Sequence, residues 1–391
     1  MPRSALFTPL RLREVTIRNR IVISPMCQYA AVDGRVNDWH RIHLGKFAQG
    51  GAGAVFAEAT AVESTGRITH GDLGIWSDEH VAGLRDIASF ISGQGAVPGI
   101  QISHAGRKAS AQRPWDGNGP LDARDLGERS EAAWETVAPS PLPTDEGWPV
   151  PEELDGARLS ALKDRFRTAA ERALRSGFRL LEVHCAHGYL LHQFLSPLTN
   201  LRRDEYGGDA ARRMRFPLEV IAAVREVWPM DLPLFVRVSA IDGLDGGLTV
   251  DDAVRFARCA RELDVDVIDC SAGGLIRPAM AGSSMTPAPG YQVPYAERVR
   301  REGGIASMAV GLIHLPRQAD EIIAAGRADL VAIARAALDD PNWPLHAARA
   351  LGEEGYDSIA VNYGFFLRKW DAILAGVKRE SPHALSGARG A

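Results

Sequence analysis

Cysteine is scarce in this chain of 391 residues. The four cysteines, Cys27, Cys185, Cys259 and Cys270, are scattered, and no two of them form a Cys-x-x-Cys pair. This pattern offers neither a disulfide framework nor a structural zinc site, and it is typical of proteins kept in a reducing environment. We therefore expect a cytoplasmic protein.

Long apolar runs and an excess of one charge are also missing. No uncharged apolar run approaches the ~18 residues that a membrane span needs, and residues 1–14 lack the apolar core of a signal peptide. The 45 basic and 49 acidic residues give a net charge of -4 without a basic stripe. We expect neither a membrane partner nor a nucleic-acid partner.

The hydrophobic residues that are present, 46% of the chain, suffice for a large core. Eight β-branched runs, alternating with helical patterns, are predicted strands: residues 17–26, 53–62, 97–104, 180–184, 233–239, 265–271, 306–313 and 328–334. Their near-continuous hydrophobicity is typical of parallel strands buried on both faces. We predict an α/β protein that forms a single (β/α)₈ TIM barrel. An open doubly wound sheet is the alternative, although residues 50–55 lack its full Gly-x-Gly-x-x-Gly fingerprint.

Helices are predicted between these strands. Apolar residues follow helical spacing over residues 160–176 and 315–325, and Thr249 with Asp252 resembles a capping box that opens a helix through residue 263. Residues 106–158, rich in proline, glycine and acidic residues, form a long insertion after the third strand, and we expect a lid-like loop there. The barrel domain is expected to span residues 1–378, with a flexible tail at 379–391.

Polar side chains gather where the predicted strands end, and in a barrel those ends open into one pocket. The sharpest signal is His184 with His187. Residues three apart on a strand face opposite ways, but the two rings converge if the strand ends near His184 and the chain turns. Converging imidazoles suit a substrate oxygen or a metal ion. With His104 as a third ligand, a metal-dependent hydrolase is one hypothesis.

Two further features lie at the ends of the predicted strands. By alternation Arg237 shares a face with Phe235 and Ser239, and a charge pointing into the barrel needs an electron-rich ligand or an internal partner such as Glu182. The seventh and eighth strands lead to Gly311 and to residues 334–335, where barrels commonly hold a phosphate.

In combination, these segments resemble the old yellow enzyme family of FMN-dependent ene-reductases, and within it the branch with thermophilic-like enzymes and some xenobiotic reductases. The matching segments run in order along the chain: residues 6–10, 19–21, 24–29, 66–69, 74–78, 101–108, 184–190, 194–197, 204–208, 290–291 and 326–330. Longer relatives with an iron–sulfur domain, which act in demethylation or isomerisation, are a further alternative that the cysteine pattern disfavours.

The resemblance implies a barrel that carries FMN. Ten residues would hold the flavin ring, its polar edge or the phosphate: Ser24, Pro25, Met26, Cys27, Ala59, Gln101, Arg237, Gly311, Ala334 and Arg335. Among them Cys27 would tune the redox potential, and Arg237 would stabilise the anionic reduced flavin. Residue 334 departs from the family, whose phosphate loop commonly reads Gly-Arg.

The resemblance also implies reduction of the activated C=C bond of α,β-unsaturated carbonyl compounds, with NADPH or NADH as reductant and no metal. His184 and His187 would bind the carbonyl oxygen, hydride would pass from FMN N5, and Tyr189 would supply the proton. Tyr29 and Lys108 would border the substrate pocket.

The C-terminal region carries a separate expectation. In the thermophilic-like branch a C-terminal arginine reaches the active site of the neighbouring subunit. Arg368, flanked by Phe366 and Trp370, is the candidate here, which implies a homodimer or homotetramer and makes Arg368 a substrate-binding residue. A terminal helix packed on its own barrel is the alternative.

Overall fold

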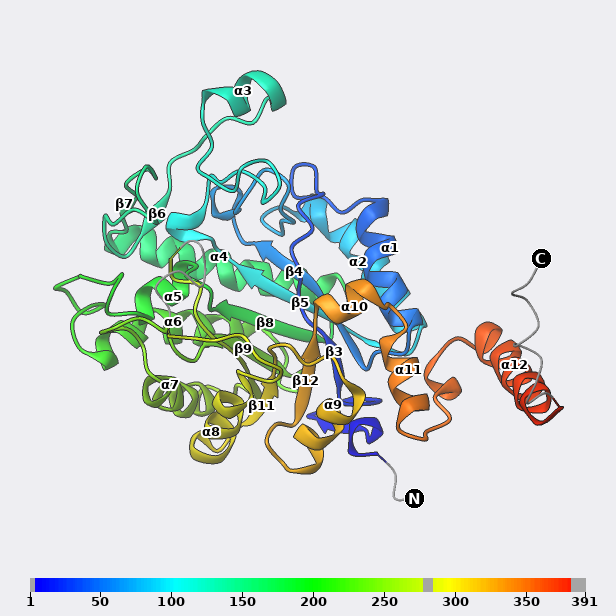
Figure 1. Ribbon diagram of the computed structural model, residues 1–391. Helices are drawn as coiled ribbons and strands as arrows, with labels where there is room; N and C mark the ends of the chain where they lie inside the picture. The colour runs from blue at the N-terminus through cyan, green and yellow to red at the C-terminus, as the bar shows by residue number, and fades with distance from the viewer. Residues whose placement is uncertain (1–3, 277–283, 381–391) are drawn as a thin grey trace, which may run out of the picture.

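A closed barrel of eight parallel strands forms the centre of the computed structural model, which describes residues 4–276 and 284–380 (Figure 1). In chain order the strands are β3 (Ile21–Ile23), β4 (Ala54–Ala61), β5 (Val97–Ser103), β8 (Leu180–Cys185), β9 (Leu234–Ser239), β10 (Val267–Ser271), β11 (Ala306–Ala309) and β12 (Leu330–Ile333). Parallel pairing of β12 with β3 closes the ring. The predicted (β/α)₈ barrel is confirmed, and the open-sheet alternative is wrong.

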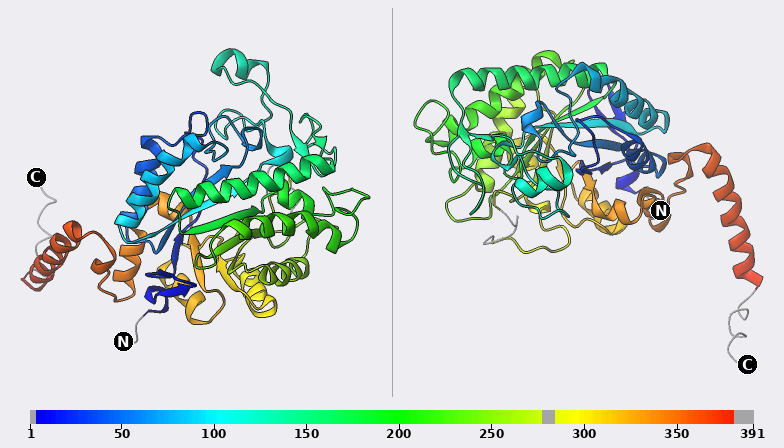
Figure 2. Two further views of the ribbon diagram at one scale, coloured as in Figure 1. Left: turned by 180° about the vertical axis from the view of Figure 1, so that it is seen from behind. Right: turned by 90° about the horizontal axis from the view of Figure 1, so that it is seen from above.

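Helices surround the barrel (Figures 1 and 2). They are α1 (Asp38–Gln49), α2 (Val81–Gly93), α4 (Gly156–Arg175), α5 (Leu190–Leu195), α6 (Ala210–Val227), α7 (Val250–Glu262), α8 (Val293–Gly303), α9 (Pro316–Ala324), α10 (Arg335–Asp339) and α11 (Trp343–Ala350). The three helices predicted from periodicity are confirmed as α4, α7 and α9. The capping box of α7 is present, because Asp252 Oδ2 accepts from the Thr249 N–H at 3.0 Å. None of the described helices is long and apolar enough to span a bilayer.

The first predicted strand, residues 17–26, is longer than the strand that forms. Strands β1 (Leu10–Leu12) and β2 (Val15–Ile17) instead make an antiparallel hairpin outside the barrel. The side chain of Asn19 turns the chain between β2 and β3, since its amide donates to Gly51 O at 2.9 Å and its Oδ1 accepts from the Ile21 N–H. Residues 24–30 then leave the sheet, which frees this segment to line a site.

The barrel interior is apolar near the start of its strands and polar further along. The rings of Phe56 and Phe235 pack edge to face with centroids 5.7 Å apart. Buried Glu182, Arg237 and Asp269 project from three consecutive strands, with Glu182 in register with Phe235 and the other two further along. This polar layer is the floor of the site described below.

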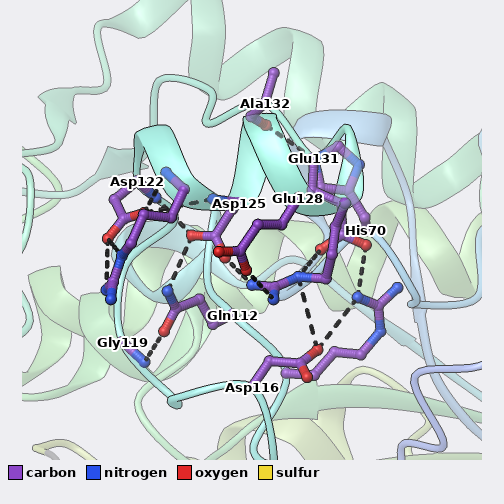
Figure 3. A network of polar contacts seen from close by, with 12 residues as sticks. His70, Gln112, Asp116, Gly119, Asp122, Asp125, Glu128, Glu131 and Ala132 are labelled. Carbon is purple, nitrogen blue, oxygen red and sulfur yellow. Dashed lines mark hydrogen bonds and ion pairs between the residues drawn. The ribbon is translucent and has the colours of Figure 1, made fainter.

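The insertion after β5 holds more regular structure than a loop. It contains the 3₁₀ turn η4 (Gly106–Lys108), helix α3 (Ala123–Arg129) and a small two-stranded pair, β6 (Val137–Ala138) with β7 (Glu152–Glu153). Helix α3 stands away from the barrel at the top of Figure 1, within a network of charged side chains (Figure 3). In that network Gln112 accepts from the Gly119 N–H at 3.2 Å and donates to Asp125 at 2.9 Å, which anchors the segment between them.

The C-terminal helix α12 (Val361–Glu380) extends away from the barrel (Figures 1 and 2). It follows the 3₁₀ turn η5 (Tyr356–Ser358); the other 3₁₀ turns are η1 (Ala5–Phe7), η2 (Ser64–Gly66) and η3 (Asp78–His80). A helix folded back on its own barrel is therefore wrong, and regular structure continues ten residues past Trp370. The predicted tail at 379–391 begins inside α12, and residues 381–391 lie outside the described part.

Candidate active site

A cavity of about 610 Å³ lies where the barrel strands end. Most of the residues singled out from the sequence line it: Ser24, Pro25, Cys27, Ala59, Gln101, Lys108, His184, His187, Tyr189, Arg237, Gly311, Ala334 and Arg335. Met26, Tyr29 and Arg368 do not line the cavity. One pocket thus collects residues that are up to 312 positions apart in the chain, from Ser24 to Ala336.

Sequence reasoning missed the other lining residues. These are Asn118, Ser271, Ala272, Gly274, Ile276, Tyr291, Gln292, Val310, Leu312, Ile313, His314, Ala332 and Ala336. Ser271 ends the sixth barrel strand, and attention to every strand end would have found it. Asn118 comes from the insertion, and nothing in the sequence marks it.

Three aromatic side chains converge on one side of the cavity. The His184 ring lies 5.2 Å from that of His187 and 5.0 Å from that of Tyr189, centroid to centroid, and both pairs are edge to face. The convergence arises because β8 ends at Cys185 and the backbone of His187 turns into the left-handed region, with φ of +59°. The predicted turn after His184 is confirmed.

The two histidines are held as neutral donors. His184 Nδ1 accepts from the Ala186 N–H at 3.2 Å, which leaves the proton on Nε2. His187 Nε2 lies 2.7 Å from Ser271 Oγ. Burial, and then the charge of Arg237, lowers the pKa of each ring well below its usual value. Each ring is therefore uncharged at neutral pH and carries one N–H.

The turn after β8 is fixed by Lys108. Its Nζ donates to the carbonyl oxygen of His187 at 2.9 Å and to that of Gly274. Between them, Gly188 has φ of +73°, and a Cβ there would lie 2.4 Å from Gly274 O. Lys108 thus shapes the backbone that presents His187 and Tyr189.

Arg237 enters the cavity from β9. One guanidinium nitrogen, Nη1, donates to Ser24 Oγ at 3.2 Å, and Nε lies 3.0 Å from Asp269 Oδ2. The partner expected from the sequence was Glu182, which instead accepts from Gln101 Nε2 at 2.7 Å. With its amide nitrogen committed to Glu182, Gln101 keeps its carbonyl oxygen for a donor in the cavity.

Cys27 lies half-buried at the cavity wall, and burial raises the pKa of its thiol well above the usual value. The group is therefore a neutral thiol, not a thiolate nucleophile. The cavity also reaches Gly311 and the first turn of α10, whose leading N–H groups have no partner within the helix.

His104, the third ligand of the hydrolase hypothesis, lies outside the cavity wall. Its Nε2 is 2.9 Å from Glu63 Oε1, and its Nδ1 accepts from the Gly106 N–H. Across residues 4–276 and 284–380, no three His, Cys, Asp or Glu side chains are grouped so as to hold a metal ion.

The cavity lies at the strand ends of the barrel, where enzymes of this fold bind substrates and cofactors. Residues 5–354 match the model of the NADH:flavin oxidoreductase / NADH oxidase family. The chain belongs to this family, to which old yellow enzymes belong, and it is an FMN-dependent oxidoreductase that takes electrons from NAD(P)H.

Named relatives agree with this assignment. The chain is 48% identical to an NADPH dehydrogenase of Geobacillus sp. (strain WCH70), over 92% of this chain and 98% of the relative. It is 42% identical to the NADPH dehydrogenase of Bacillus subtilis (strain 168), over 89% and 96% of the two chains.

Solved structures share the fold. Morphinone reductase superposes with a TM-score of 0.72 at 26% identity, over 90% of both chains. A 2-naphthoyl-CoA reductase reaches a TM-score of 0.79 at 23% identity, and the chain spans about half of it, 53%. At 23% identity, the similarity to the 2-naphthoyl-CoA reductase shows a shared fold and nothing more.

The residues present fit FMN. A flavin ring needs an acceptor for its ring N–H and a cation for its electron-rich edge, and Gln101 and Arg237 offer these. A phosphate needs backbone N–H donors, and the first turn of α10 offers them at the far end of the same cavity.

Proposed function

We propose that the enzyme reduces the activated C=C bond of α,β-unsaturated carbonyl compounds, including xenobiotic enones, at the expense of NADPH or NADH. The observation that carries the proposal is the convergence of neutral His184 and His187 with Tyr189 beside Arg237 and Cys27. In this cavity FMN would be held by Ser24, Pro25, Cys27, Ala59, Gln101, Arg237, Gly311, Ala334 and Arg335. Met26 does not line the cavity and would contribute only through the segment that carries Pro25 and Cys27. Bound FMN supplies the chemistry of hydride transfer, from the nicotinamide and then from N5 to the β-carbon.

Residues of the chain would bind the substrate and supply the proton. His184 and His187 donate N–H groups to the substrate carbonyl oxygen, where negative charge grows as the β-carbon is attacked. Neutral rings serve this role over the physiological pH range, because their lowered pKa values keep them from titrating there. Tyr189, edge to face with His184, delivers its hydroxyl proton to the α-carbon. Lys108 borders the substrate pocket and holds the His187–Gly274 turn, whereas Tyr29, which does not line the cavity, would border it only from outside the wall.

Incubation with 2-cyclohexenone and NADPH tests the proposal. The expected products are cyclohexanone and NADP⁺ in equal amounts, with FMN in the heat-released cofactor fraction. The double variant His184→Ala/His187→Ala serves as the matched control, and it should retain FMN while product formation falls. Release of FAD, or NADPH consumption without cyclohexanone, would overturn the proposal.

We further propose that α12 pairs with a second copy of the chain. Its residues Tyr363, Phe366, Trp370, Ile373 and Val377 are each more than half exposed and follow alternating spacings of three and four. Such a seam is typical of helices that pack against another helix. Arg368 lies off this seam, bonded to Glu354 and Asp357 of its own chain. In the proposed dimer it would exchange these partners for substrate in the neighbouring cavity.

A further inference from the structure

Two buried carboxyl groups lie near Arg237, and neither of them lines the cavity. Register places Asp269 of β10 level with Arg237, and Glu182 lies one pleat below it on β8. Both acidic side chains are fully buried, and the Arg237 side chain is nearly so. None of the reaction steps above uses either acid.

These acids have few partners besides the guanidinium. Neither oxygen of Asp269 receives a hydrogen bond within the described residues, and Arg237 Nε at 3.0 Å is its ion-pair partner there. Glu182 Oε1 accepts from Gln101, whereas Oε2 has no hydrogen-bond partner among the described residues. The interior thus holds one permanent cation and two acids that compete for it.

The net charge of Arg237, Asp269 and Glu182 sets the electrostatic potential in the cavity. A buried guanidinium needs a counter-charge, and one ionised carboxylate supplies it. Burial raises the pKa of both acids, and repulsion from Asp269 raises that of Glu182 further, so the ionisation of a second carboxylate is opposed. Each negative charge that is present behind Arg237 reduces the positive potential in front of it.

We propose that Asp269 and Glu182 are positioning residues that set how much positive charge Arg237 presents to the reduced flavin, and thereby set the flavin midpoint potential. This inference rests on the proposed placement of FMN against Arg237. Asp269 has the larger role, because it contacts the guanidinium directly, and Glu182 acts on Arg237 and through Gln101.

Potentiometric titration of the FMN-loaded enzyme tests the inference without any enone. Asp269→Asn should raise the midpoint potential, since the anionic reduced flavin then meets a less compensated Arg237. We expect at least a tenfold change in the ratio of reduced to oxidised flavin at a fixed potential, which is about 30 mV for a two-electron couple. Glu182→Gln should raise it less, and the double variant should raise it most.

The matched control is Asp242→Asn. Asp242 is a buried acid bonded to His192 and Ser196, and it is neither a hydrogen-bond nor an ion-pair partner of Arg237 among the described residues, so its loss should leave the potential at the wild-type value. If Asp269→Asn does not load with FMN, Glu182→Gln decides at a pH above the raised pKa of Glu182, about 8, where the wild-type acid is ionised. The amide oxygen of the variant can still accept from Gln101. Potentials of the loaded variants equal to that of the control overturn the inference. A wild-type protein that binds no FMN would instead contradict the proposed function.

Discussion

At the scale of single residues, the hydrogen bonds that each polar group makes within the protein decide which donor and acceptor atoms are available to a ligand. Gln101 gives its amide nitrogen to Glu182, and His184 takes the Ala186 N–H, so the atoms left for a ligand are a carbonyl oxygen and a ring N–H. A neutral ring is a good donor to an oxygen that gains charge. The site therefore favours an acceptor oxygen beside an electron-rich ring.

Tyr189→Phe should separate the two half-reactions. Only reduction of the enone needs a proton at carbon, so that step should slow by about 100-fold or more. Flavin reduction by NADPH should change little, and a quinone, which needs no protonation at carbon, should still be reduced. Stopped-flow absorbance of the flavin measures each half. Equal slowing of both would remove Tyr189 as the acid.

The double variant His184→Ala/His187→Ala should no longer donate hydrogen bonds to the substrate carbonyl oxygen. Loss of one such donor costs ~3 kcal/mol of transition-state stabilisation, and the pair should cost more than either alone. Phenolates, which place an anionic oxygen at the same donors, should no longer perturb the flavin spectrum. An unchanged phenolate titration with bound FMN would place the substrate elsewhere in the cavity.

At the scale of elements, hydrophobic runs predicted all eight barrel strands, because parallel strands buried on both faces carry a strong local signal. The ends of the strands were less predictable. Ile17 belongs to the β1–β2 hairpin, and this depends on pairing with Leu10, which no local pattern shows. Likewise the partner of Arg237 is Asp269, because the register places Asp269 beside Arg237 and Glu182 beside Phe235, and the sequence does not give this register.

Helix α1 carries a pH-dependent element of stability. Burial, and then the charge of Lys46, lowers the pKa of His43 from 6.5 to about 4 in the folded chain. The unfolded chain thus binds a proton that the folded chain excludes, so stability is fully present above pH 6.5 and falls as the pH drops toward 4. The slope for this group is at most about 1.4 kcal/mol per pH unit.

His43→Leu should therefore flatten the dependence of the melting temperature on pH between 6.5 and 4, with the ring replaced by an apolar side chain against Phe47. Thermal unfolding followed by circular dichroism at a series of pH values measures this. A slope equal to that of the unchanged protein would show that His43 is not responsible.

At the scale of the whole molecule, the barrel closes within one chain, whereas α12 leaves it with most of its apolar side chains exposed. Exposed aromatic and aliphatic side chains on a helix that extends from the fold are costly in water, and the proposed pairing of α12 with a second copy would cover them. The sequence marked Phe366, Arg368 and Trp370 as interface residues, yet could not show that their helix leaves the barrel. That outcome depends on contacts with η5 and not on the composition of the helix.

Removal of residues 361–391 should convert a dimer into a monomer that still binds FMN, because the cavity lies entirely within residues 24–336. Sedimentation velocity of the two forms measures the change. Arg368→Ala is the matched variant, which should keep the dimer while enone binding weakens. Equal sedimentation of the full and shortened chains would refute pairing through α12.

The central claim is that the cavity transfers hydride from reduced FMN to an enone. The most direct measurement is anaerobic mixing of the NADPH-reduced enzyme with 2-cyclohexenone while the absorbance of oxidised flavin is recorded. We predict that this absorbance returns fully, with one cyclohexanone formed per flavin. A flavin that stays reduced in the presence of the enone, yet reoxidises when oxygen is admitted, would contradict the account.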